Sequence, residues 1–305
     1  MSVADAASPR ARFSGAEASH RGAIGETGDQ VGEARGLFGP GTVSWRIDRE
    51  VFVLAGGSCA LLMQAAHPAV AAGVAQHSSY RTDPYGRLSR TLRSSLAVAF
   101  GTRRQAAAAI RHINAIHAKV RGTIPETGEP YRALDPAALL WVHATLVDTA
   151  VRVYDRFVAH LTAEDAEAYH RECAPVAWQL GIPRAALPPT LAELRAWMDE
   201  MVASGAVRVT PTARDIARTI LRPGRFPPGI VWDAAHLASL ATLRPDLREQ
   251  YGLAWDPRRE RAAALLAGGT RRLLPLVPPP LRYVPHARRA VARVHHVAAG
   301  AGGAD

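Results

Sequence analysis

Within residues 87–122, arginine, threonine and histidine side chains have types and spacing that could hold a cofactor. Arg87, Arg90 and Thr91 fall at i, i+3 and i+4, so on a helix they share one face. Further along, His117 belongs to an apolar helical stripe with Ile110, Ile113 and Val120. Imidazole binds iron and guanidinium groups pair with propionates, so this arrangement suits haem. A core histidine bonded to a backbone carbonyl explains the same spacing.

A second histidine, His143, lies in an apolar segment, residues 139–146, with Thr145 two positions later. A polar group inside such a helix must be hydrogen-bonded or coordinated, because an unsatisfied buried one costs ~1–3 kcal/mol. His67 and His77 lie in another apolar stretch. Four histidines inside or beside apolar helices predict a polar pocket in the middle of the core, although each could be a buried histidine bonded to a carbonyl.

Two pairs of acid and histidine have the spacing used in helical di-iron bundles. They are Glu167 with His170 and Asp233 with His236. A bundle site also needs inward-facing carboxylates from two further helices, and the long apolar helices offer none. The charged surroundings of both pairs favour a solvated helix face over a di-metal site.

The elements that would position these residues are helices. Capping residues, prolines and helical periodicity predict one long helix that begins at 45–50. Two buried helices are expected within 51–80, with a break at His67–Pro68. Further helices are predicted over 87–100, 103–120, 135–157, 162–180, 191–202, 213–221, 232–243, 258–266 and 285–297. Residues 122–130 read as a loop, and 275–280 as an extended segment. No alternating strand pattern, Asn-Gly hairpin or internal repeat appears.

These patterns predict an all-α fold in a single large helical domain enclosing a haem pocket. The expected parts are a disordered segment over 1–37, a haem-binding domain over 38–284, and a basic helix with a flexible tail over 285–305. Residues 51–80 carry no charge, which is also a property of membrane spans. Interruptions at Gly56, Gly57, Gln64, His67 and Pro68 favour two buried helices.

Composition excludes several function classes. The net charge of +10 invites a nucleic-acid partner, but the basic residues are scattered and aromatic residues make up only 6%. The two cysteines, Cys59 and Cys173, are far apart and fit a reducing cytoplasm, and the start of the chain lacks a signal peptide. No Walker loop, Rossmann glycine motif, G-x-S-x-G or H-E-x-x-H is present. We therefore expect a cytoplasmic protein that acts on neither nucleotides nor nucleic acid.

Several short motifs occur in a fixed order along residues 39–285. They are H-P-A-V-A-A-G-V, H-S-S-Y-R-T-D-P, G-R-L-S-R-T, I-H-A-K-V-R-G, D-P-A-A-L-L-W-V-H-A-T-L and L-G-I-P. This set resembles the MpaB-type oxygenase family, which shares its catalytic domain with the latex-clearing protein, a rubber oxygenase. The resemblance implies an all-helical protein that binds a b-type haem and uses dioxygen to cleave double bonds of isoprenoid chains.

The resemblance also assigns roles to residues. His117 would be the iron ligand, and Arg87, Arg90 and Thr91 would lie in the haem pocket as catalytic residues. Further cofactor contacts would come from Arg121, His143 and Thr145. In the rubber oxygenases the position of Arg90 is a lysine able to approach the iron. A permanently charged guanidinium is a poor iron ligand, so the sequence departs from the family here.

We therefore expect a haem b-dependent oxygenase that acts with dioxygen on an apolar substrate of isoprenoid or lipid-like kind. The substrate would pack against the helices within 51–74. The alternative is a non-catalytic helical protein that binds haem or a lipid. The basic segment 285–296 is either an ordinary surface helix or a weak peripheral contact with anionic lipid.

Overall fold

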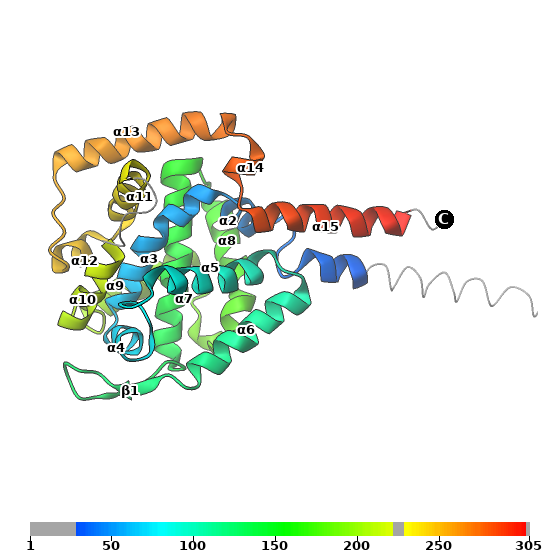
Figure 1. The fold of residues 1–305 in the computed structure, drawn as a ribbon. Helices are drawn as coiled ribbons and strands as arrows, with labels where there is room; N and C mark the ends of the chain where they lie inside the picture. The colour runs from blue at the N-terminus through cyan, green and yellow to red at the C-terminus, as the bar shows by residue number, and fades with distance from the viewer. Residues whose placement is uncertain (1–28, 222–228, 303–305) are drawn as a thin grey trace, which may run out of the picture.

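Helix α7 (Pro136–Val153) runs through the centre of the computed structural model, which describes residues 29–221 and 229–302 (Figure 1). Its first turn is capped by Asp135, whose carboxylate accepts hydrogen bonds from the backbone amides of Ala137 and Ala138 at 2.9 and 3.1 Å. Pro136 has no amide hydrogen to satisfy at that position. A π-helical turn, Tyr154–Val158, continues the helix. Trp141, Val147 and most other α7 side chains are buried, so this helix forms the middle of the core.

Two short helices, α3 (Gly57–Ala65) and α4 (Pro68–His77), form a corner, and α3 packs against α7. The indole nitrogen of Trp141 donates to the carbonyl of Met63 at 2.8 Å. The hydroxyl of Tyr251 donates to the carbonyl of Leu62, also at 2.8 Å. The predicted pair of buried helices broken at His67–Pro68 is therefore confirmed. Within the described residues no single helix is long and apolar enough to cross a membrane. Only the segments Val51–Ala65 and Pro68–His77 taken together reach that length and apolarity, and they are bent by 106° relative to each other.

Helices α5 (Pro84–Phe100) and α6 (Arg103–His117) pack against each other and are joined by two residues, Gly101 and Thr102. Thr102 and Gln105 form a reciprocal capping box at the start of α6. The Thr102 hydroxyl accepts from the Gln105 amide at 3.2 Å, and the Gln105 side chain accepts from the Thr102 amide at 2.9 Å. Local sequence therefore fixes where the turn between these two helices lies.

The remaining helices surround this centre. They are α2 (Val43–Asp48), α8 (Ala163–Gln179), α9 (Leu191–Ala203), α10 (Pro211–Leu221), α11 (Gly229–Thr242), α12 (Pro245–Gln250), α13 (Pro257–Leu273), α14 (Pro279–Arg282) and α15 (Pro285–Gly302), with 3-10 turns η1 (Val51–Gly56), η3 (Arg184–Ala186) and η4 (Leu274–Leu276). One large apolar cluster joins α3, α4, α7, α8, α9 and α10. The predicted all-α class and single domain are confirmed.

Several predicted elements differ from the structure. The helix expected to open at 45–50 is the six-residue α2, because Glu50 adopts an extended conformation and forms an antiparallel bridge with Tyr283. The predicted extended segment 275–280 contains η4 and the start of α14. In the predicted loop 122–130, a hairpin is present whose strands are β1 (Arg121–Thr123) and β2 (Pro130–Arg132). Helix α12 was not predicted.

The predicted disordered segment 1–37 lies mostly outside the described residues. Its described end, residues 29–35, is helical. Ala34 and nearby Phe38 are only 4% and 5% exposed. The Arg293 side chain of α15 donates to the Ala34 carbonyl at 3.0 Å. This end of the segment is therefore ordered by a partner that is distant in the sequence.

Candidate functional site

Helix α5 presents a polar stripe formed by Arg87, Thr91 and Ser94. At i, i+4 and i+7 these side chains share one face. Arg87 is half-buried, and its guanidinium makes no hydrogen bond or ion pair with the residues that the structure describes. Loss of water and the nearby charge of Arg90 both lower the pKa of Arg87. An unpaired, half-buried cation of this kind is suited to receive an anionic ligand group.

Arg90 lies to one side of this stripe. Its guanidinium donates to Asp83 at 3.1 Å and to the hydroxyl of Ser79 at 2.8 Å. The side chain is 59% exposed. Asp83 also accepts from the amide of Gly86 at 2.8 Å and so caps α5. In this arrangement Arg90 fastens the turn that leads into α5, whereas Arg87 on the polar stripe has no such attachment.

His117 is the last residue of α6 and is half-buried. Its Nδ1 atom is buried and has no hydrogen-bond partner. Burial lowers the pKa of His117, so the imidazole is neutral at pH 7 and keeps a lone pair for a metal. One turn before it, the Asn114 amide donates to the carbonyl of Gln179 at the end of α8, at 2.9 Å. That bond fixes the end of α6 against the helical body.

His143 on α7 is 7% exposed, and its Nε2 atom is buried without a hydrogen-bond partner. Burial lowers the pKa of His143 to about 4, with a smaller contribution from the nearby His170 of α8. Thr145 is fully buried, but its hydroxyl donates to the Val142 carbonyl of its own helix at 2.8 Å. Residues two apart on a helix point in different directions. His143 and Thr145 therefore do not line one surface.

One side of α7 is only partly covered. Trp141 and Thr149 point toward α3, and His143 lies near α8. Between these directions Val142 is half-buried and Leu146 is 51% exposed. In Figure 1 helix α5 crosses in front of α7, and α6 runs below α5. An exposed leucine on the central helix offers an apolar contact surface.

Other predicted site residues lie elsewhere. Arg121 is exposed on β1, and its carbonyl lies 3.1 Å from Nε2 of His77, which is also exposed. His67 caps the corner between α3 and α4, where Asp135 is a nearby charge. The prediction that four histidines form one pocket in the core is therefore wrong. His143 is buried in the core and His117 is half-buried at the end of α6, whereas His67 lies at the corner between α3 and α4 and His77 lies beside β1.

The first acid–histidine pair, Glu167 with His170, is used in packing. The Glu167 carboxylate accepts from the amide of Leu191 at 2.9 Å, and Nε2 of His170 lies 2.9 Å from the carbonyl of Pro188. Both bonds hold the connection between α8 and α9. Across the described ranges, no group of three or more His, Cys, Asp or Glu residues is arranged to hold a metal ion.

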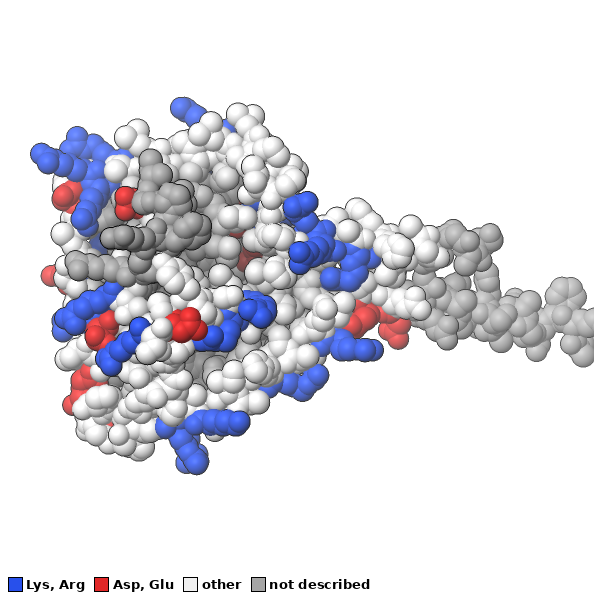
Figure 2. Space-filling model, viewed as in Figure 1, with Lys and Arg blue, Asp and Glu red and all other residues white. Residues whose placement is uncertain are grey.

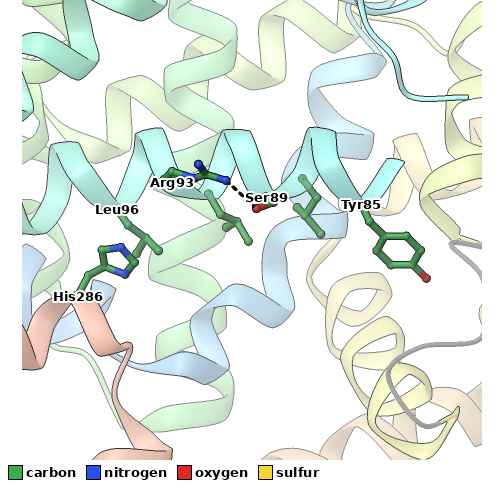
Figure 3. A pocket seen from close by; sticks show the side chains of 7 residues that line it. Tyr85, Ser89, Arg93, Leu96 and His286 are labelled. Atoms are coloured by element: carbon green, nitrogen blue, oxygen red, sulfur yellow. Dashed lines mark hydrogen bonds between the residues drawn. The ribbon is translucent and has the colours of Figure 1, made fainter. Parts of the chain in front are cut away.

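The opposite face of α5 lines a groove of about 340 Å³ that was not predicted (Figure 3). Its lining is Tyr85, Leu88, Ser89, Leu92, Arg93 and Leu96 of α5, with His286 of α15. The leucines stand at intervals of four, a spacing visible in the sequence. What the sequence does not show is that α15 begins beside this stripe, because that contact joins positions almost 200 residues apart.

The sequence was compared with known proteins. Residues 45–274 match the family model described as the catalytic domain of the ER-bound oxygenase mpaB/B' and rubber oxygenase. No curated protein and no solved structure matches the chain. The match covers most of the chain, including α5, α6 and α7, which carry the polar stripe, His117 and His143. The chain belongs to the mpaB and rubber oxygenase catalytic-domain family.

Proposed function

We propose that this chain is a haem b-dependent oxygenase that uses dioxygen on an apolar substrate. The observation that carries the proposal is His117: a neutral imidazole with a buried, partnerless nitrogen at the end of a fixed helix, in a chain of an oxygenase family. Haem iron needs one protein ligand, so the proposal requires no cluster of metal-binding side chains. The haem, when bound, supplies the binding and activation of dioxygen, while the protein sets ligation, polarity and access.

Groups on α5 and α7 would suit that cofactor. The half-buried guanidinium of Arg87 would pair with a propionate, which would relieve its unfavourable burial. The Thr91 hydroxyl, one turn further along α5, would donate a hydrogen bond on the same face. Val142 and Leu146 would pack on the apolar part of the macrocycle, and His143 would remain neutral beside it. The free thiols of Cys59 and Cys173 support a reducing, cytoplasmic environment.

The substrate would lie on the apolar side chains that remain exposed next to these helices. The structure shows that α3 and most of α4 are used for packing, so the substrate surface expected over 51–74 is reduced to η1, where Val51 and Leu54 are each 40% exposed. The groove on α5 offers a further apolar surface. An elongated hydrocarbon matches both better than a compact polar substrate.

The ligand assignment is tested by absorption spectroscopy of protein expressed with added haem. Wild-type protein should show a Soret band, and His117→Ala should lose most of it while keeping its far-ultraviolet helicity. The matched control is His112→Ala, because His112 is an exposed histidine on the same helix. A colourless wild-type protein would overturn the proposal. Equal haem content in the two variants would show that His117 is not the ligand.

A second function, a non-catalytic haem- or lipid-binding protein, is favoured by one observation. Arg90 stands where the rubber oxygenases have a lysine, and its guanidinium is held by Asp83 and Ser79 at the surface. Oxygen uptake in the presence of a polyprenyl substrate separates the two functions. Uptake that depends on substrate and is absent from His117→Ala supports the oxygenase. A haem-loaded protein with no uptake supports the binding protein.

A further inference from the structure

Four leucines at one edge of the molecule are almost fully exposed. Leu265, Leu276, Leu281 and Leu273 are 77%, 77%, 73% and 62% exposed, the highest values among large hydrophobic side chains in the described ranges. They belong to α13, η4 and α14, which follow one another along the upper edge in Figure 1. We call these four residues the leucine edge. Large apolar side chains exposed to this degree along one edge suit an interaction site better than ordinary surface.

The orientation of α13 is fixed by its other face. Ala263 is fully buried, and the Thr270 hydroxyl donates to the carbonyl of Phe157 at 2.6 Å. The Arg271 guanidinium donates to the carbonyl of Asp155 on the same inner side. With these residues facing the body, Leu265 and Leu273 must point outward. The exposure of the leucines is therefore a consequence of how α13 is held, and not of a loose end of the chain.

The same part of the chain is strongly cationic. Residues 261–302 contain seven arginines and no aspartate or glutamate: Arg261, Arg271, Arg272, Arg282, Arg288, Arg289 and Arg293. Arg282 is neutralised by Glu50, and Arg293 donates to backbone carbonyls. Arg261, Arg272, Arg288 and Arg289 are exposed. Figure 2 shows basic side chains over the start of α15, with few acidic ones beside them.

We propose that the leucine edge docks on the surface of an anionic lipid bilayer. The leucines would enter the boundary between headgroups and acyl chains, and the exposed arginines would contact lipid phosphates and carboxylates. The positive charge of residues 261–302, which include no acidic residue, favours this partner, since a neutral apolar partner would gain nothing from the arginines. Docking at this edge would also bring η1, which contacts α14 and exposes Val51 and Leu54, close to the membrane.

This surface differs from the membrane contact expected for the basic segment 285–296. In that segment Ala287 and Ala290 are 2% and 0% exposed, because they pack in a cluster with Trp45 and Phe100, and Val294 is 7% exposed. The apolar side of α15 therefore faces the protein, and only its arginines remain for lipid. Removing α15 would uncover that cluster, so single substitutions are the better test.

The test is co-sedimentation of the full chain with vesicles of phosphatidylcholine, with and without phosphatidylserine. Wild-type protein should bind the anionic vesicles at low salt. The double variant Leu276→Ser/Leu281→Ser should bind about tenfold more weakly, and Arg272→Glu should lower binding by a similar factor. Matched controls are Leu134→Ser and Arg132→Glu, exposed residues at or after β2, at the lower end of the molecule in Figure 1. Both controls should bind like wild type.

Three outcomes would overturn the proposal. The first is equal binding of all variants, and the second is equal binding to both kinds of vesicle. The third is self-association in sedimentation velocity, without lipid, that the leucine variants abolish, because the edge would then be an interface between two copies of the chain. If Arg272→Glu loses binding while the leucine variant does not, the surface recognises charge alone and the leucines do not insert. Haem content affects none of these readouts, so this test stands apart from that of the proposed function.

Discussion

At the scale of single residues, the candidate site is defined by polar groups that the described protein leaves without partners. Nδ1 of His117 and Nε2 of His143 are buried with no hydrogen bond, and the Arg87 guanidinium is half-buried without a counter-ion. Each such group costs stability in the absence of a ligand. Their neighbours Arg90 and Thr145, in contrast, are hydrogen-bonded within the chain. Buried nitrogens without a partner also occur at His67 and His170, so an unpaired group indicates a site residue only together with the family match.

Arg87 provides a prediction in which stability and binding change in opposite directions. Arg87→Met should raise the free energy of unfolding of haem-free protein by about 1 kcal/mol, because it removes a desolvated, unpaired charge. The same substitution should lower haem retention. Arg90→Met is the control and should change stability by less than about 0.5 kcal/mol, since its ion pair is exposed. Urea denaturation and haem titration measure both effects, and a destabilised Arg87→Met would contradict the assignment.

His143 predicts a dependence of stability on pH. Its pKa in the folded protein is about 4, below the ordinary 6.5. Between these values the unfolded chain binds the proton more readily, so stability falls as the pH drops from 6.5 to 4. The loss for this one group is on the order of 3 kcal/mol. His143→Gln should flatten that slope relative to wild type in urea denaturation across this range. His112→Gln, at an exposed position, should keep the wild-type slope.

At the scale of elements, the start of each helix near the site is set by a cap that the sequence contains. Asp83 caps α5, Thr102 with Gln105 caps α6, and Asp135 caps α7. These caps place His117 at the end of α6 and His143 two turns into α7. The hairpin after α6 then returns the chain to α7, with Arg121 paired opposite Arg132.

The Asp135 cap can be tested directly. Asp135→Ala removes an acceptor of two backbone amides and should cost about 1 kcal/mol of unfolding free energy, because α7 is the central helix and those amides lose their partner. Asp135→Asn keeps a side-chain oxygen and should stay close to wild type. Thermal unfolding of the three proteins measures the difference. An alanine variant as stable as wild type would show that the cap contributes nothing.

At the scale of the whole molecule, the C-terminal segment is fastened to the core by a buried ion pair. Glu50 is 1% exposed and accepts three hydrogen bonds from Arg282, at 3.1 and 2.9 Å from Nε and 2.7 Å from a terminal nitrogen. Next to it, Tyr283 bridges to the Glu50 backbone and stacks beneath the Arg49 guanidinium at 4.4 Å. These contacts hold α14 and the start of α15 in place, and with them the leucine edge and the groove lined by His286.

Breaking this pair should destabilise the whole protein. Arg282→Met leaves the Glu50 carboxylate buried and unpaired, and we expect a loss of about 3–5 kcal/mol in the free energy of unfolding. The double variant Glu50→Leu/Arg282→Met should recover most of that loss, because no uncompensated charge remains. Urea denaturation compares the proteins, and hydrogen exchange over residues 279–302 reports release of the segment. A single variant as stable as wild type would show that the ion pair does not hold the segment.

The sequence by itself determined the class of fold and most helix boundaries, and its resemblance to a family pointed to His117 as a candidate iron ligand. Helix caps such as Thr102 and Asp135 depend on residues within four positions of each other, and so do helical stripes such as that of His117. These patterns can therefore be recognised in the sequence without knowing which distant segments pack together. Tertiary structure alone decided the rest. Helix α2 ends early because Glu50 pairs with Arg282, 232 positions away. Helix α15 turns its apolar side inward onto Trp45 and Phe100. Arg90 is bonded to Asp83 and so lies outside the stripe of Arg87. Burial and ion pairing depend on which distant segments meet, and that information is not contained in any local spacing.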